Sequence, residues 1–222
     1  MARPSRNLDQ ALLAAGRALL PDRGCAGLSV REVADRAGVN LGMFHYHFRT
    51  REAFLRAVLQ QAYEEMFARL ELESAGDGGP LENLRAALRV LGRFLRDNRP
   101  LLGRVLADAL AGEPSAREFV RDNLPRHVAV LHGLFEAGRK AGAIRAIAFE
   151  QALGVCGGAV VLPILAGGAV AHSGMVAPAR SRSLERTLLS DAAIDERIDL
   201  AVGALAPSPS RPPAAAKKRR AA

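Results

Sequence analysis

Residues 29–51 contain two short helical patterns that meet at a sharp turn from Gly38 to Asn40. Ser29 and Glu32 predict a capping box at the start of the first pattern, because their side chains can accept hydrogen bonds from free backbone N–H groups. Gly38 suits the left-handed conformation that ends a helix, and Asn40 suits the cap of the next helix. A helix-turn-helix is therefore the first structure to expect in this chain.

Apolar residues keep helical spacing over most of the remaining sequence. We expect a first helix that starts near Asn7 and ends by Pro21, and a long helix that begins after a cap at Thr50. Residues 74–80 form a clear break, after which helical patterns continue. Pro125 must either kink its helix or open a new one.

The last part of the chain predicts an apolar helix from about 151 to 166, a loop to about 183 and a final amphipathic helix that carries Ile194 and Ile198. A convincing alternating strand pattern does not occur. The predicted fold is all-α.

Positive charge is concentrated at the two ends of the chain. Residues 1–51 carry a net charge of +4 and residues 207–222 carry +5, out of +8 for the whole chain. A basic module beside a near-neutral body indicates a polyanionic partner for that end. We expect the Pro- and Ala-rich residues 207–222 to be disordered, either as a solvated tail or as a further contact to DNA.

Catalytic and metal-binding patterns are not discernible in the sequence. Cys25 and Cys156 lack the spacing of a metal site or a disulfide framework, and we expect both to be inert small hydrophobic residues. Nucleophile–base pairs, carboxylate pairs and phosphate-binding glycine loops are not recognisable either. We therefore expect no enzyme activity, cofactor or metal, and a cytoplasmic location, since the N-terminus lacks the apolar run of a secretory signal.

Residues 151–179 contain no charged side chain, so two readings of this segment compete. It approaches the ~20 apolar residues that a membrane helix needs, and Gly154 and Gly158 have the spacing of a membrane packing motif. Alternatively, Gly154, Gly157 and Gly158 permit the close approach of a helix from a second copy of the chain. The frequent Gly and Pro residues, without a second span or an aromatic belt, favour the second reading and no membrane association.

The stretch around the turn resembles the TetR family of bacterial transcription repressors. The resemblance is carried by Gly27-Leu28-Ser29, Val33-Ala34, Ala37-Gly38-Val39, Gly42, Tyr46-His47-Phe48 and Arg51-Glu52-x-x-Leu55. It implies a three-helix DNA-binding domain over residues 1–50 with the helix-turn-helix at about 29–48, a helical regulatory and dimerisation domain over 51–206, and the basic tail over 207–222.

The resemblance also implies roles for single residues. Arg31 matches a position that can reach a base edge, where an Arg fork suits guanine, unless it is only a solvated helix charge. Leu41 and Met43 match base-facing positions that could contact thymine methyl groups. Arg51 matches a clamp on a DNA phosphate. The full predicted DNA surface is Arg31, Leu41, Gly42, Met43, His45, Tyr46, His47 and Arg51.

Three of these positions involve aromatic or imidazole side chains. His45 and His47 match positions that contact phosphates, although the family more often has Tyr where this chain has His45. Because the two histidines point to different faces of a helix, they do not suggest a shared metal site. For Tyr46, packing against the core or the DNA backbone is favoured over base reading.

The family resemblance further implies an operator in double-stranded DNA, a homodimer and a small apolar or amphipathic effector that releases a repressor from DNA. The predicted effector pocket consists of Leu91, Phe94, Leu106, Leu131, Phe135 and Cys156. Each of these residues could instead be ordinary core. The alternative hypothesis is a helical small-molecule-binding or membrane-associated protein without sequence-specific DNA binding.

Overall fold

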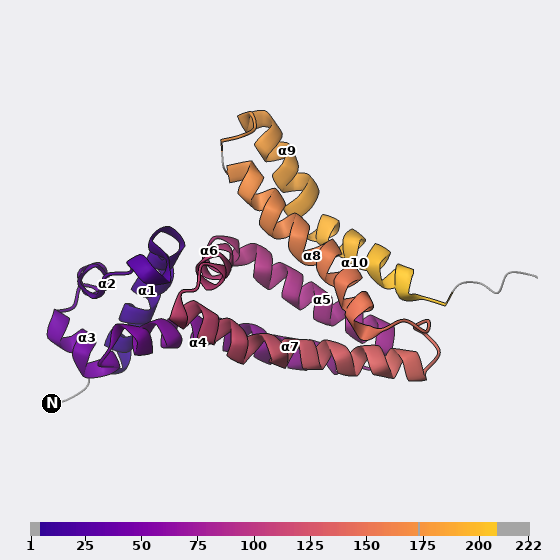
Figure 1. Ribbon diagram of the computed structural model, residues 1–222, viewed down its shortest axis with the longest axis horizontal. Coiled ribbons are helices and arrows are strands. Elements are labelled where there is room, and N and C mark those ends of the chain that lie inside the picture. The colour runs from indigo at the N-terminus through magenta and orange to yellow at the C-terminus, as the bar shows by residue number, and fades with distance from the viewer. Residues whose placement is uncertain (1–4, 173, 208–222) are drawn as a thin grey trace, which may run out of the picture.

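The computed structural model describes residues 5–172 and 174–207. Every regular element in these residues is a helix, which confirms the all-α fold (Figure 1). Ten helices follow in order: α1 (Ser5–Gly27), α2 (Val30–Ala37), α3 (Leu41–Phe48), α4 (Arg51–Ser74), α5 (Pro80–Asp97), α6 (Arg99–Leu110), α7 (Pro114–Lys140), α8 (Phe149–His172), α9 (Pro178–Leu189) and α10 (Asp191–Leu205). The predicted disorder of the basic tail concerns residues that lie almost entirely outside the described part.

The helix boundaries in the first half of the chain follow from local capping. Gly38 adopts φ 69°, and its N–H contacts the carbonyls that end α2. The side chain of Asn40 accepts a hydrogen bond from Met43 N at 2.9 Å, and that of Thr50 accepts one from Ala53 N at 3.1 Å. These caps fix the turn between α2 and α3 and the start of α4, as the sequence predicts.

The predicted capping box at the start of α2 is wrong. Ser29 has the backbone conformation of an N-cap, but its side chain makes no capping hydrogen bond. Glu32 is instead held by Arg23 of α1, with a guanidinium nitrogen 2.7 Å from its carboxylate. An ion pair to a neighbouring helix has replaced the local bond that the sequence pattern suggests.

Two hydrophobic cores lie along the chain, and α4 runs through both. The first core joins α1, α2 and α3 to the first half of α4, where Phe44, Phe54 and Leu55 are fully buried. The second core joins the other half of α4 to α5, α7, α8 and α10. One continuous helix therefore connects the head formed by α1–α3 to the body (Figure 1).

Two expectations for the body are corrected by the structure. The loop predicted to extend to about residue 183 contains α9, whose Pro178 occupies the first turn. The apolar helix predicted to end near 166 continues to His172 as α8. Pro125 lies inside α7, which is a single helix from Pro114 to Lys140, so it does not open a new element.

Among the described helices, α8 has a stretch that is long and apolar enough to cross a membrane by length and composition, Phe149–Val170. One face of α8 packs in the second core through Ala152, Cys156, Val160 and Ile164. The opposite face carries outward-facing apolar side chains, of which Leu162 is 64% exposed. α8 is thus a core helix of the body with an uncovered apolar side.

Candidate DNA interface and internal cavity

Helix α3 presents one side to the core and the other to solvent. Phe44 is fully buried and contacts the rings of Phe48 and Phe54 at 5.7 and 5.0 Å between centroids. This anchoring leaves Gly42, His45 and Tyr46 exposed and Leu41 and Met43 partly exposed. The predicted base-facing positions therefore lie on an accessible helix surface, at the end of the molecule farthest from α9 and α10 (Figure 1).

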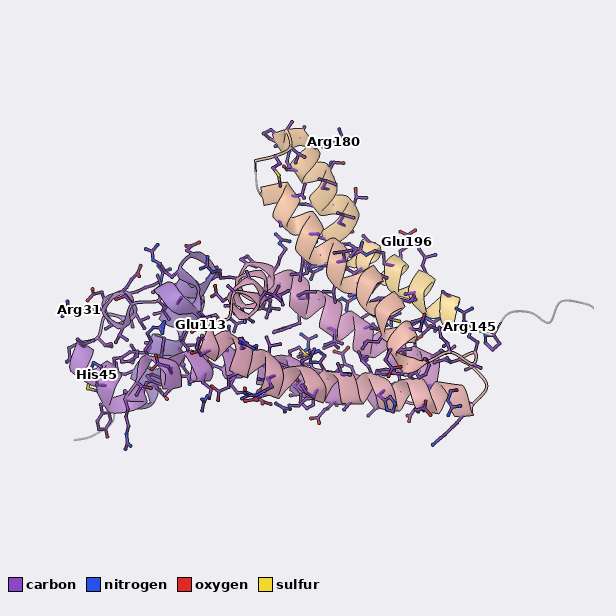
Figure 2. All side chains as sticks on the ribbon, viewed as in Figure 1. Arg31, His45, Glu113, Arg145, Arg180 and Glu196 are labelled. Atoms are coloured by element: carbon purple, nitrogen blue, oxygen red, sulfur yellow. The ribbon has the colours of Figure 1, made fainter. Side chains whose placement is uncertain are left out.

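Tyr46 does not pack in the core, because 74% of its surface is exposed. The core alternative for this residue is therefore wrong. Arg31 is also exposed on α2, and it lies at the same end of the molecule as His45 (Figure 2). The accessible side chains of α2 and α3 thus gather at one end of the head.

The two histidines of α3 have different surroundings. His45 is exposed, with Nδ1 3.4 Å from the carbonyl oxygen of Arg49. His47 is half-buried, and its Nε2 has no hydrogen-bond partner among the described residues. Arg49, which is not among the predicted DNA-contacting residues, is exposed at the end of α3 and adopts φ 57°. The phosphate contacts assigned to both histidines remain predictions.

Arg51 holds the C-terminal end of α1 as well as the start of α4. Its Nη2 donates to the carbonyl oxygens of Cys25 at 2.6 Å and Ala26 at 3.0 Å, and its Nε donates to Leu28 O at 3.2 Å. Carbonyls at a helix end lack intrahelical donors, and a planar guanidinium can serve several of them at once. Only Nη1, beside Glu52 at 3.4 Å, remains for a contact to a phosphate.

A cavity of about 450 Å³ lies in the body, with walls supplied by α4, α5, α6, α7 and α8. Its size is within the ~300–1,000 Å³ typical of small-molecule sites. Its lining includes five of the six predicted pocket residues: Leu91, Phe94, Leu106, Leu131 and Cys156. Phe135 instead lines a smaller neighbouring pocket of about 20 Å³.

Three cavity-lining residues with hydrogen-bonding side chains are not among the predicted pocket residues: Tyr63, Asn123 and His127. Tyr63 donates its hydroxyl proton to the backbone oxygen of Asn123 at 2.8 Å. Burial lowers the pKa of His127 and raises that of Tyr63 to about 12. The spacing of Asn123 and His127 on α7 could have placed them on one face, but only the fold brings Tyr63 of α4 beside them.

Helix α6 belongs to both the cavity and the head. Leu102 and Leu106 line the cavity, while Val105 is buried in the first core. Asp108, only 7% exposed, accepts a hydrogen bond from Cys25 N at 2.6 Å and one from Arg104 Nε at 3.0 Å. Helix α6 therefore contacts both the cavity and the end of α1.

Comparison with known proteins agrees with this geometry. Residues 12–58 match the model of the bacterial regulatory proteins of the tetR family. The HTH-type transcriptional repressor KstR2 of Mycolicibacterium smegmatis is 30% identical over 83 residues, which cover 37% of this chain and 40% of that protein. The HTH-type transcriptional repressor NemR of Escherichia coli is 37% identical over 76 residues, or 34% of this chain and 38% of that protein. The matched stretch thus spans about two-fifths of each relative.

Solved structures resemble nearly the whole fold. A Clostridium perfringens protein described as a fatty acid metabolism regulator superposes with a TM-score of 0.68 at 17% identity, over 89% of this chain and 100% of that chain. The ketosteroid transcriptional regulator KstR2 of Mycobacterium tuberculosis gives a TM-score of 0.65 at 17% identity, over 90% and 95%.

The head, with its capped turn and its accessible α3, has a helix-turn-helix architecture, and the helical body lies behind it. The head is therefore similar, over residues 12–58, to the corresponding part of the TetR family of bacterial regulatory proteins.

Proposed function

We propose that this protein is a dimeric repressor that leaves its operator when a small apolar or amphipathic molecule occupies the cavity between α4 and α8. The observation that carries the proposal is α6, which lines the cavity through Leu106 and reaches the end of α1 through Asp108. A ligand can shift a conformational equilibrium only through different contacts in the two states. The contacts of α6 provide a physical route for such a difference.

Residues 1–50 form the DNA-binding domain in this proposal and residues 51–206 the regulatory domain, in a cytoplasmic protein. The α3 surface reads bases through Leu41, Gly42 and Met43, while Arg31 contacts a guanine from α2. His45, Tyr46, His47 and Arg51 contact the DNA backbone. Support comes from the exposure of α3 opposite its buried Phe44.

The partner in the dimer is proposed to cover the outer side of α8. Leu162 is 64% exposed there, and Val155, two turns earlier on α8, is 42% exposed. A Cβ placed on Gly154 or Gly158 would meet nothing within 4 Å, so a second helix has room to approach closely. Two reading heads are needed because one helix-turn-helix contacts too few base pairs for specific binding, and half-sites lie about 34 Å apart.

The dimer surface is testable with one outward-facing residue. Leu162→Arg places a charge on the proposed interface and should give a monomer by light scattering. Leu72→Arg is the matched control, because Leu72 is 77% exposed on α4, outside the proposed interface. A dimeric Leu162→Arg protein would contradict this choice of surface.

DNA binding is tested with the ligand-free protein and the DNA upstream of its own gene. The expected result is tighter binding to that duplex than to a scrambled duplex of equal composition, at each of several salt concentrations. The alternative, a small-molecule-binding or membrane-associated protein, is favoured by the cavity and by the length of α8 alone. Equal affinity for both duplexes, or partition of the protein into membranes, would support that alternative.

A further inference from the structure

The cavity is almost wholly apolar, and its polar side chains lie together on two facing helices. Tyr63 belongs to α4, and Asn123 and His127 are one turn apart on α7. The described lining residues include no Asp, Glu, Lys or Arg. These three side chains are therefore the candidates for a specific polar contact to a molecule in the cavity.

Two of the three polar side chains are already committed within the protein. Asn123, 3% exposed, donates through Nδ2 to Gln60 Oε1 at 3.1 Å and to Phe119 O at 2.9 Å, and its Oδ1 accepts from Gln60 Nε2 at 3.1 Å. The hydroxyl of Tyr63 has a single proton, which it donates to Asn123 O. Neither group has a proton left for a ligand.

The bond of Tyr63 also determines which nitrogen of His127 carries a proton. Nδ1 of His127 lies 3.4 Å from the Tyr63 hydroxyl oxygen, whose own proton points to Asn123 O. The imidazole must therefore donate from Nδ1 in this contact. Desolvation lowers the pKa of His127, while a hydrogen bond to the Asn123 backbone acts in the opposite direction. In the neutral ring, Nε2 is then an unprotonated acceptor.

Nothing in the described part of the chain donates to this Nε2, and His127 lies within the stretch of α7 that lines the cavity, from Val120 to Leu131. The side chain is only half-buried. Its Nε2 is the one uncommitted hydrogen-bonding group among the three polar residues of the lining.

We propose that the effector is an uncharged, largely apolar molecule with a hydroxyl group, and that Nε2 of His127 accepts a hydrogen bond from that hydroxyl. This assignment deepens the proposed function and rests on the cavity being its effector site. His127 selects the donor, and the leucine-rich wall accommodates the apolar skeleton. The molecule is thus an alcohol or phenol by chemical class.

Other polar groups fit this cavity less well. A carboxylate would enter without a cation in the lining and would face the lone pair of Nε2. The guanidinium of Arg126 lies over the rings of Tyr63 and Phe67 and is paired with Glu64 at 3.1 Å. An ether or a ketone offers only acceptors. It could bond to His127 only if the ring proton moved from Nδ1 to Nε2, which would break the hydrogen bonds that Nδ1 donates.

The test compares isomers that differ in one proton donor, using the full chain without DNA. Binding of n-decanol against its isomer methyl nonyl ether, and of para-octylphenol against its isomer para-heptylanisole, is measured by calorimetry, with decanoate as the anion. Each hydroxyl compound should bind about two- to tenfold tighter than its isomer, and decanoate more weakly than decanol. Equal affinities within both pairs, no binding by either hydroxyl compound, or tighter binding of decanoate would overturn the proposal.

Two matched variants separate this role from a structural one. His127→Phe removes the acceptor and should bring the affinity ratio within each pair to about one, whereas His127→Gln keeps an acceptor and should retain a preference. His132→Phe is the control, because His132 is on the same helix but is exposed and outside the cavity lining. Selectivity that persists in His127→Phe would refute the assignment, and the comparison in the wild-type protein stands even if that variant does not fold.

The outcome is independent of the operator experiment. Absence of specific DNA binding with hydroxyl selectivity intact would contradict the proposed repressor function but support the proposed site at His127. Specific DNA binding without hydroxyl selectivity would support the repressor function and contradict the proposed hydrogen bond to His127.

Discussion

Replacing Arg51 by Ala is expected to destabilise the head even in the absence of DNA. The side chain is 27% exposed, and its guanidinium serves the carbonyls of Cys25, Ala26 and Leu28 at 2.6, 3.0 and 3.2 Å. Truncation leaves these oxygens with weaker partners at the point where α1 ends and α2 begins. A phosphate contact alone would predict no such loss.

The magnitude follows from the number and exposure of these bonds. A hydrogen bond to a charged group contributes about 1.5–3 kcal/mol, but carbonyls near the surface regain much of this from water. A total cost of about 2–3 kcal/mol is therefore expected. For a chain of this size, each kcal/mol corresponds to a shift of about 2–4 °C in Tm, so the expected decrease is about 4–12 °C.

Thermal unfolding and DNA binding of Arg51→Ala and Arg51→Lys give the assay. Lys keeps the positive charge for a phosphate but lacks the planar fork that spans three carbonyls. Arg51→Lys should therefore recover the salt dependence of DNA binding but less than half of the lost stability. An Arg51→Lys protein as stable as the wild type, or an unchanged Tm in Arg51→Ala, would refute this reading of the side chain.

Three further predictions concern the head, the connection to the body and the cavity. Arg31→Ala should relax base preference at one operator position by about 1–3 kcal/mol without lowering Tm, because Arg31 is exposed; a uniform loss over all sequences would contradict this. Asp108→Ala leaves Cys25 N without its buried acceptor, so the free energy of unfolding measured in urea should fall by about 1–3 kcal/mol. The same variant should reduce the effect of n-decanol on DNA affinity. Glu196→Ala, which removes a carboxylate on the distant helix α10, should change neither quantity. Burial holds the pKa of His127 below its ordinary value of 6.5, so its contribution to stability is complete above that pH and is lost as the pH falls towards its folded-state pKa. On acidification the wild type should therefore lose more stability than His127→Phe. Equal losses in the two proteins would exclude this titration.

The helix-turn-helix could be predicted from the sequence because its determinants are local. Gly38 ends α2 and Asn40 starts α3 through contacts within a few residues, and the i, i+4 spacing of Phe44 and Phe48 identifies the inner face. Even here one local expectation fails, since Glu32 pairs with Arg23 instead of closing a capping box. A favourable local pattern was overridden by a neighbour nine residues away in the sequence.

Five of the six residues predicted for the effector pocket line one cavity, for a different reason. Leu91, Leu106 and Leu131 are apolar residues of helices that must pack together, so the same pattern fits core and cavity alike. Periodicity does not predict where packing leaves a void. The same apolar pattern therefore placed Phe135 in the predicted pocket, although Phe135 lines only the smaller pocket. The length of α8 and the presence of α9 were likewise missed, because Gly and Pro residues read locally as a loop.

By itself, the sequence determined the all-α class, the helix-turn-helix and the separation of charge, since each depends on residues close together in the chain or on composition. Only the tertiary structure decided that Tyr63 lies beside His127, that Asp108 holds the end of α1, and that Arg51 is occupied by three carbonyls. These contacts join residues 23 to 83 positions apart, and neither propensity nor periodicity specifies which distant partner a polar side chain meets.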